Sequence, residues 1–184
     1  MLLALVWLDS AAFYILQNTP TLNRFGWSGA SLQWQNAGIH LTAALLAGWL
    51  IDRGGLSRLP LTAFVCLGGA AICVSNAHES AASLTHWLYA AGVSLYSVAL
   101  VCAPAAECNH DLRRAAVRAA VLFSVAGWFG SALGIGMAQD LHAIPGWFIA
   151  SAATILGIAS LPRRRSPRTR SPSSVAPVLS TPGR

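Results

Sequence analysis

The chain has 184 residues, of which 55% are hydrophobic and only 10% are charged, and its mean hydropathy is +0.55. A soluble domain usually carries about a quarter charged residues, so this composition excludes an ordinary soluble protein and indicates an integral membrane protein. The net charge of +6 comes from arginines without any lysine, and five of these arginines lie within residues 163–170. Because most of the others separate apolar blocks, we interpret the charge as a topology signal and not as a nucleic-acid surface.

Six apolar segments follow one another along the chain, and we expect each to form a membrane-spanning helix. Each has roughly the 20 residues that cross a hydrocarbon layer, and their continuous apolar runs favour helices over a barrel. The predicted fold is an all-α six-helix transmembrane bundle over residues 1–161, followed by a disordered tail over 162–184 that is rich in proline, serine and arginine. The segments cover residues 1–17, 32–51, 59–76, 85–104, 115–138 and 145–161.

The arginines between these segments predict their orientation. The loops after the second and fourth segments, together with the tail, are rich in arginine. The loops after the first, third and fifth segments contain a single arginine, Arg24. The positive-inside rule places the arginine-rich side, and with it both termini, in the cytoplasm. We therefore predict a multi-pass protein of the cell (inner) membrane. The basic tail is expected to anchor this topology, with contact to anionic lipid headgroups as the alternative.

The first segment contains an acidic residue, Asp9. A helix that begins at Met1 would place it about 12 Å along the span, where a carboxylate costs about 2.5 kcal/mol or more. Asp9 shares one helix face with Phe13 and Gln17, at spacings of i, i+4 and i+8. We expect this face to turn toward the bundle interior or a water-filled cavity. Two interpretations remain open: a site that handles a substrate or protons, and an interhelical hydrogen bond.

The second and fourth segments carry further polar side chains. Asn36 and His40 share one face of the second segment, and Tyr96 lies deep in the fourth. Histidine changes its protonation between pH 5 and 8, so His40 can form a proton-linked pair with Asp9, or it can be a buried structural group. The predicted substrate and proton cavity comprises Asp9, Gln17, Asn36, His40 and Tyr96.

The stretch after the fourth segment raises the question of a metal site. Thiolate and imidazole ligands can bind copper or zinc, but the spacing here matches no metal motif. We interpret these residues as scattered polar groups and predict no metal and no cofactor. No Ser–His–Asp order, paired-carboxylate site or phosphate loop stands out, so we expect no enzyme. The residues concerned are Cys102, Glu107, Cys108 and His110.

The fifth segment reads "AGWFGSALGIGMA" and contains a run of small residues. Gly130 and Gly134 form a GxxxG pair, and Gly127 extends the same small-residue surface. Small side chains let helix backbones approach closely in a membrane, where lipid gives helices no hydrophobic reason to associate. We predict that these glycines form a helix-packing surface.

The loop "GWLIDRGGLSR", residues 48–58, lies between the second and third segments, on the predicted cytoplasmic side. It resembles the G-x-x-x-D-R-x-G-R-[RK] signature that the major facilitator superfamily carries at this place in each six-helix half. The match covers Gly48, Asp52, Arg53 and Gly55, while Leu56 stands where an arginine is usual and Arg58 can take its place. The stretches "VWLDSAAFYILQNTP" and "AGWFGSALGIGMAQ" are also similar to bacterial members of this family.

The resemblance implies a secondary transporter that moves a small solute or ion, with coupling to protons left open, and it matches the C-terminal half best. It also implies that Gly48, Asp52, Arg53, Gly55 and Arg58 form a cytoplasmic loop latch, in which the acid bridges to the opposite half. Alternating access needs two such halves. Because the chain enters its first segment directly at Met1, we expect a missing upstream half, supplied by a separate chain or by a second copy. The alternatives are a non-transporting scaffold or truncated remnant, and a copper-handling accessory of respiratory enzyme assembly.

Overall fold

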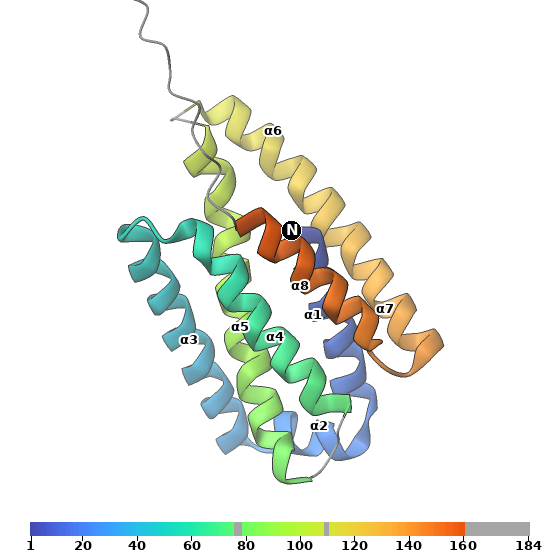
Figure 1. The fold of residues 1–184 in the computed structure, drawn as a ribbon. Coiled ribbons are helices and arrows are strands. Elements are labelled where there is room, and N and C mark those ends of the chain that lie inside the picture. The colour runs from blue at the N-terminus through green and yellow to red at the C-terminus, as the bar shows by residue number, and fades with distance from the viewer. Residues whose placement is uncertain (76–78, 109–110, 161–184) are drawn as a thin grey trace, which may run out of the picture.

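The computed structural model describes residues 1–75, 79–108 and 111–160, so His110 and the tail predicted over 162–184 lie outside the described residues. All regular structure in the described part of the chain is helical (Figure 1). The α-helices are α1 (Leu2–Asn18), α2 (Pro20–Trp27), α3 (Ala30–Asp52), α4 (Leu59–Ser75), α5 (Glu79–Glu107), α6 (Leu112–Leu122), α7 (Gly130–Leu141) and α8 (Gly146–Ser160). Two further segments are the 3-10 turn η1 (Leu56–Arg58) and the π-helical segment η2 (Phe123–Phe129).

A helix covers each of the six apolar segments, but the structure does not support a simple bundle of six membrane-crossing helices. Within the described residues, three stretches are long and apolar enough to cross a membrane: Leu56–Val74, Ala82–Glu107 and Leu112–Leu141. The apolar helices α1 and α8 have 17 and 15 residues, fewer than the roughly 20 that a span needs. Helix α3 has 23 residues, but the glutamine, asparagine and histidine side chains of its first half lower its hydropathy.

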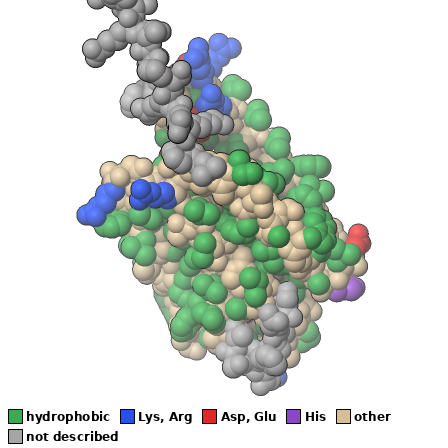
Figure 2. Space-filling view, viewed as in Figure 1, with side chains coloured by type: hydrophobic (Ala, Val, Ile, Leu, Met, Phe, Trp, Pro, Cys, Tyr) green, Lys and Arg blue, Asp and Glu red, His purple; other side chains and the backbone are tan. Residues whose placement is uncertain are grey.

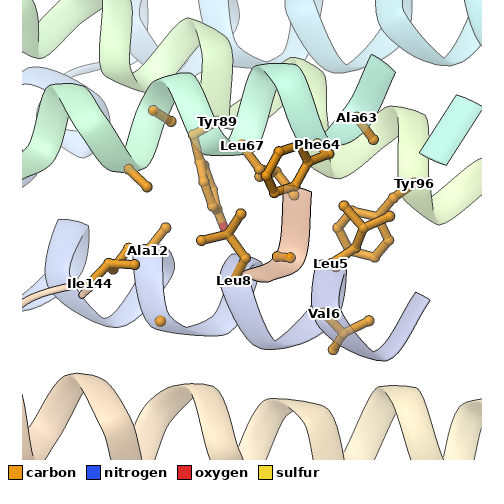
Figure 3. Close-up of a cluster of buried hydrophobic side chains, with 14 of the residues drawn as sticks. Leu5, Val6, Leu8, Ala12, Ala63, Phe64, Leu67, Tyr89, Tyr96 and Ile144 are labelled. Carbon is orange, nitrogen blue, oxygen red and sulfur yellow. The ribbon is translucent and has the colours of Figure 1, made fainter. Parts of the chain in front are cut away.

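Helix α1 lies inside the bundle and α5 links it to α3. As Figure 1 shows, α7 runs along one side of α1, while α4 and α8 cover another, and α3 packs against α5 at the far edge. The core lies between α1, α4 and α5, where Leu5, Leu8 and Leu67 are fully buried (Figure 3). Helix α5 therefore contacts both α1 and α3.

The outer surface of the bundle is strongly apolar. Figure 2 shows hydrophobic side chains spread across the visible face, and Trp34, Trp128 and Leu45 are 78%, 82% and 66% exposed. Contiguous apolar surface of this extent marks an interaction site or a lipid-facing surface. The structure therefore agrees with a protein whose helices contact a membrane.

Most of the described arginines lie toward one end of the molecule. The end of α3, the start of α4 and the start of α6 lie toward the same end of the molecule in Figure 1, and they carry Arg53, Arg58, Arg113 and Arg114. Arg24, in α2, lies toward the opposite end. The loops that are rich in arginine in the sequence thus lie at one end of the folded chain.

Two glycines let α7 lie directly against α1. A Cβ atom at Gly134 would collide with the carbonyl oxygen of Trp7 and would lie 2.8 Å from the Cβ of Ser10. At Gly130 it would lie 3.1 Å from the Cδ1 atom of Leu3. The same interface contains a 3.0 Å hydrogen bond from the hydroxyl of Ser10 to that of Ser131.

Gly127 differs from these two glycines. It lies in η2, and the nearest described atom to a Cβ there would be the Cδ1 of Phe123, at 3.9 Å. Close backbone approach to α1 therefore depends on Gly130 and Gly134, while Gly127 lies beside the contact.

We predict that Gly134→Ala lowers the stability of the protein by about 1–3 kcal/mol, because the added methyl group forces α1 and α7 apart. Thermal unfolding in detergent measures this change. Gly136→Ala, two residues further along α7, is the matched control, because a Cβ at Gly136 meets nothing within 4 Å. The control should be neutral or slightly stabilising, since alanine favours helix over glycine. Equal melting temperatures for the two variants would contradict the close packing.

Candidate functional site

The most unusual polar contact in the bundle joins α1 to α5. The hydroxyl of Tyr96 donates a 2.6 Å hydrogen bond to Oδ2 of Asp9, at about the middle of α1. Oδ1 of Asp9 is screened from solvent and has no hydrogen-bond partner among the described residues. Tyr89 also interacts electrostatically with Asp9, and both tyrosines reach from α5 toward α1 (Figure 3). Asp9 therefore has an acceptor oxygen that can hold a proton or accept a hydrogen bond from a ligand.

The sequence places Asp9 at the edge of the core because α1 has two different faces. Leu5, Leu8 and Leu16 are fully buried on one face. Phe13 and Gln17 are exposed on the other, one and two turns beyond Asp9. Asp9 as a residue is partly buried between these two faces, while its Oδ1 atom is screened from solvent.

Phe13 begins an aromatic cluster at the α2 end of the molecule. Its ring stacks on Tyr89 with centroids 6.4 Å apart and meets Trp27 edge-on at 6.5 Å. Trp27 in turn lies edge-on to His86, whose Nε2 is 2.8 Å from the carbonyl oxygen of Leu22. The cluster fastens the short helix α2 across the ends of α1 and α5.

His40 does not pair with Asp9. Its Nδ1 lies 2.7 Å from the hydroxyl oxygen of Ser94, which links α3 to α5. Ser94 and Tyr96 are two residues apart, so they point about 200° apart around α5 at 100° per residue. The two polar contacts therefore lie on opposite sides of α5, and the predicted proton-linked pair of Asp9 and His40 is not formed.

The remaining cavity residues lie near the α2 end. The side-chain amide of Asn36 donates a 2.7 Å hydrogen bond to the carbonyl oxygen of Gly26. Gln17 is exposed in the last turn of α1, and its backbone carbonyl accepts a 2.9 Å hydrogen bond from Asn23. The structure thus brings Asp9 and Tyr96 together but does not gather all five predicted residues around one cavity.

A large apolar groove lies elsewhere, between α3 and α5. Its volume is about 490 Å³, and its lining contains none of the five predicted cavity residues. The walls include Ile39, Thr42 and Trp87. The sequence does not predict this groove, because the groove depends on how α3 and α5 pack against each other and not on residue type.

Sequence analysis also missed the roles of His86, Trp27 and Ser94. His86 is only 3% exposed and covers Gly26, where a side chain would collide with its ring. The signals that point to this contact are the Thr-Pro start of α2, which favours a helix N-terminus, and the glycine beside Trp27. A single loop sequence does not indicate which histidine such a glycine will meet.

The loop "GWLIDRGGLSR" ends α3 with a specific helix cap. Gly54 has φ +76°, and its N–H donates to the carbonyl of Ile51 over 2.8 Å, while the N–H of Gly55 donates to that of Leu50 over 2.7 Å. This pair of hydrogen bonds is the Schellman motif, which favours glycine at the left-handed position. A Cβ at Gly55 would lie 2.8 Å from the Leu50 carbonyl oxygen, so both glycines are explained by the turn.

The charged residues of the loop do not pair with one another in the described part of the chain. The guanidinium of Arg53 lies 3.9 Å above the ring of Trp49, and Arg58 ends η1. Asp52 forms no ion pair with any described residue. Gly48 faces open space, with nothing within 4 Å of a Cβ placed there.

Metal ligands are not clustered in the described residues. No three of their His, Cys, Asp or Glu side chains lie close enough together to hold a metal ion. Cys102 and Cys108 are free thiols, as are Cys66 and Cys73, and His110 lies outside the described residues.

Comparison of the chain with protein-family models, with curated proteins and with solved structures finds no match. The resemblance to the major facilitator superfamily therefore rests on the residues of the loop and on the pattern of apolar segments.

We predict that Tyr96→Phe lowers the free energy of unfolding by about 1–3 kcal/mol, because it removes the 2.6 Å hydrogen bond that Oδ2 of Asp9 accepts inside the bundle. In an Asp9→Ala background the same substitution should have a much smaller effect, so a double-mutant cycle measured by thermal unfolding isolates the contact. Tyr14→Phe is the control, because the Tyr14 hydroxyl bonds to no described residue. Additive effects of the two substitutions would show that the contact contributes nothing.

We predict that Gly54→Ala destabilises the protein by about 1 kcal/mol, since an L-residue resists the left-handed conformation of the helix cap. Gly48→Ala, inside α3 and in open space, should be neutral or stabilising. Chemical unfolding of the two variants in parallel measures the difference. A Gly54→Ala variant as stable as Gly48→Ala would rule out the cap.

Proposed function

We propose that the chain transports a small solute or ion across a membrane as one half of a major-facilitator-type secondary transporter, with protons carried by Asp9. The observation that supports this most directly is the Asp9–Tyr96 contact, in which one carboxyl oxygen accepts a 2.6 Å hydrogen bond and the other has no described partner. A group of this kind, between apolar helices, is costly as a charge and acceptable as a neutral acid. Proton uptake and release at Asp9 would then be coupled to conformation.

The coupling has a simple physical basis. When protonated, Asp9 is neutral and can remain between α1 and α5 in apolar surroundings. When it loses its proton, the carboxylate favours a state in which water, a cation or a donor of the substrate reaches Oδ1. Because Phe13 and Gln17 are exposed on the same face of α1, this face is where such access would open.

A half-transporter needs a partner. Alternating access in this class depends on two bundles that rock around a shared site. We infer that the second bundle is either a separately encoded six-helix half or a second copy of this chain. It would cover the face of α1 that carries Asp9, Phe13 and Gln17, and the unpaired carboxylate of Asp52 would bridge to it as the cytoplasmic loop latch.

The full topology that we propose has six membrane spans, with both termini in the cytoplasm and the chain in the cell (inner) membrane. The 17 residues of α1 extend about 26 Å at 1.5 Å per residue, a few ångströms less than a ~30 Å hydrocarbon layer. Local thinning of the bilayer accommodates such a mismatch at a modest cost. The arginines gathered at one end of the helices support this orientation.

A second candidate function is a non-transporting membrane scaffold. It is favoured by the way polar side chains link helices: Tyr96 to Asp9, His40 to Ser94 and Ser10 to Ser131. Interhelical hydrogen bonds of this kind stabilise membrane bundles without any transport. The two candidates differ in whether Asp9 must exchange a proton.

The experiment that separates them tests the protonation of Asp9 and its role in flux. Dicyclohexylcarbodiimide reacts with protonated carboxylic acids in apolar surroundings, so it should label Asp9 in the membrane-embedded protein, and labelling should fall as the pH rises. Mass spectrometry of peptides identifies the modified residue. Asp140, which is exposed at the end of α7, should stay unlabelled and serves as the internal control.

The functional part of the test uses liposomes with a trapped pH indicator and an imposed proton gradient, screened against a panel of small solutes. In liposomes that also contain the partner half, or a second copy of the chain if the chain self-associates, solute-dependent proton flux should occur with the unmodified protein and with Asp140→Asn. It should fall at least tenfold with Asp9→Asn. Asparagine keeps the shape of the side chain and an acceptor oxygen for Tyr96, so the fold should persist. Unchanged flux in Asp9→Asn would refute proton coupling at Asp9. Absence of any flux, with host phenotypes unchanged by Asp9→Asn, would favour the scaffold.

A further inference from the structure

Two adjoining hollows lie where α6 begins. One has a volume of about 500 Å³ and is lined by Asp111, Arg113, Arg114, Val117 and Arg118. The other has a volume of about 330 Å³ and lies between α5, α6 and the first turn of α1. Both include Val117 and Arg118, so the two hollows meet, and together they form one site with a basic end and an apolar end.

The basic end has an excess of one positive charge. It contains three guanidinium groups, and the two acids beside them, Asp111 and Glu107, each bind one arginine. Arg114 lies 3.0 Å from Asp111, and Arg118 lies 2.7 Å from Glu107. Arg113 forms no ion pair with any described residue. Among the described residues, the site therefore has one guanidinium without an acidic partner and matches a ligand with a single negative charge.

The existing ion pairs do not block such a ligand. The side chains of Arg114 and Arg118 are 81% and 56% exposed. Exposed ion pairs contribute only about 0–1 kcal/mol, so an arginine can leave its carboxylate for a phosphate at little cost. Guanidinium groups bind phosphate oxygens with two parallel hydrogen bonds, which a flexible exposed arginine can form.

The apolar end determines which anion fits. Its walls include Leu2, Pro104, Val121 and Leu122, from three different helices. Proline inside α5 cannot donate a backbone hydrogen bond, and its ring disturbs the preceding turn, so Pro104 marks an irregular wall. An inorganic phosphate would leave this part of the site empty. An amphiphile with a phosphate head and a hydrocarbon chain would fill both ends.

The position of the site favours a lipid from the surrounding bilayer. The site lies at the end of the molecule that carries most of the described arginines, at the start of the apolar stretch Leu112–Leu141 (Figure 1). This is where the headgroup layer would meet the flank of α6 if the helices span a membrane. Basic pockets between helices at this depth bind anionic headgroups.

We infer that this hollow, which we name the α5–α6 lipid site, binds one anionic phospholipid. Its phosphodiester would lie among Arg113, Arg114 and Arg118, and one acyl chain would lie along Val121 and Pro104 between α5 and α6. The inference rests on the membrane location given under the proposed function, but it does not depend on transport or on Asp9.

The test uses the full chain purified in detergent and native mass spectrometry to count retained lipid. Phosphatidylglycerol and phosphatidylcholine with identical acyl chains are added at equal concentration, and inorganic phosphate is added in a separate arm. We expect at least fivefold more retained phosphatidylglycerol than phosphatidylcholine, with no retained phosphate. Equal retention of the two lipids would refute the role of charge, and retained phosphate would identify a simple anion site in place of a lipid site.

Variants then locate the binding. Arg113→Gln combined with Arg118→Gln should reduce phosphatidylglycerol retention at least fivefold, and Val121→Asn should reduce it while leaving every charge in place. Arg24→Gln, which removes one positive charge at the opposite end of the molecule, should retain the lipid as the unmodified chain does. If Arg24→Gln weakens retention equally, the site is wrong and binding follows total charge.

The result is independent of the transport assay. Asp9→Asn should retain phosphatidylglycerol normally, so a failure of proton coupling would leave the lipid site intact. Release of the chain from membranes by an alkaline carbonate wash would instead refute the membrane location on which both proposals depend. Thermal unfolding of each variant in detergent shows whether a loss of bound lipid is caused by a loss of fold. A variant that melts and retains phosphatidylglycerol like the unmodified chain would show that the substituted residue does not belong to the lipid site.

Discussion

The contact between Tyr96 and Asp9 is the constraint around which the rest of this bundle is arranged. Helix α1 presents an almost entirely apolar surface to α4, α5, α7 and α8, and its only acidic side chain meets α5. Burying a carboxyl group in such surroundings is unfavourable unless it is hydrogen-bonded or neutral. The tyrosine satisfies one oxygen and leaves the other available. Stability and the proposed chemistry therefore depend on the same pair of atoms.

The packing on the other side of α1 supports this arrangement. Gly130 and Gly134 bring α7 directly onto the backbone of α1, which fixes the position of the helix that carries Asp9. Small residues achieve this without side-chain interdigitation, as is common between helices in lipid. A shift of α7 would therefore move Asp9 relative to Tyr96. In the same way, the aromatic cluster around Phe13 and Trp27 holds the α2 end of α1 against α5.

The apolar runs predicted helix positions well but not how the helices face one another. The third segment was expected over 59–76 and α4 ends at Ser75. The fourth was expected to end at Pro104, but α5 continues to Glu107, so this proline lies inside the helix and does not end it. Asp9 and His40 each fell on a polar face of their own helix, yet α5 separates them. Periodicity states which residues share a face of one helix, and only the packed structure states which helix that face meets.

The membrane spans illustrate the same limit. Sequence length and hydropathy indicated six spans, whereas three described helices meet both criteria in full. Helix α1 does not meet the criterion for length, because it has 17 residues. Helix α3 is long enough but does not meet the criterion for hydropathy, because of its polar side chains. The glycine pair at the end of α3 was noticed as part of a family signature, and the structure adds a local reason for it in the helix cap. A signature residue can thus have a structural role as well as the functional one inferred from resemblance.

The π-helical segment η2 has a consequence for the geometry of the whole 112–141 helix. Its hydrogen bonds span one more residue than those of an α-helix, so the angular phase of α7 is offset from that of α6. A helical wheel drawn continuously through both would misplace the glycine face relative to the arginine face. If the same seven residues of η2 wound as an α-helix, one half would turn against the other by about 100°. Either the glycines would then rotate away from α1, or the arginines would rotate away from the end of α5.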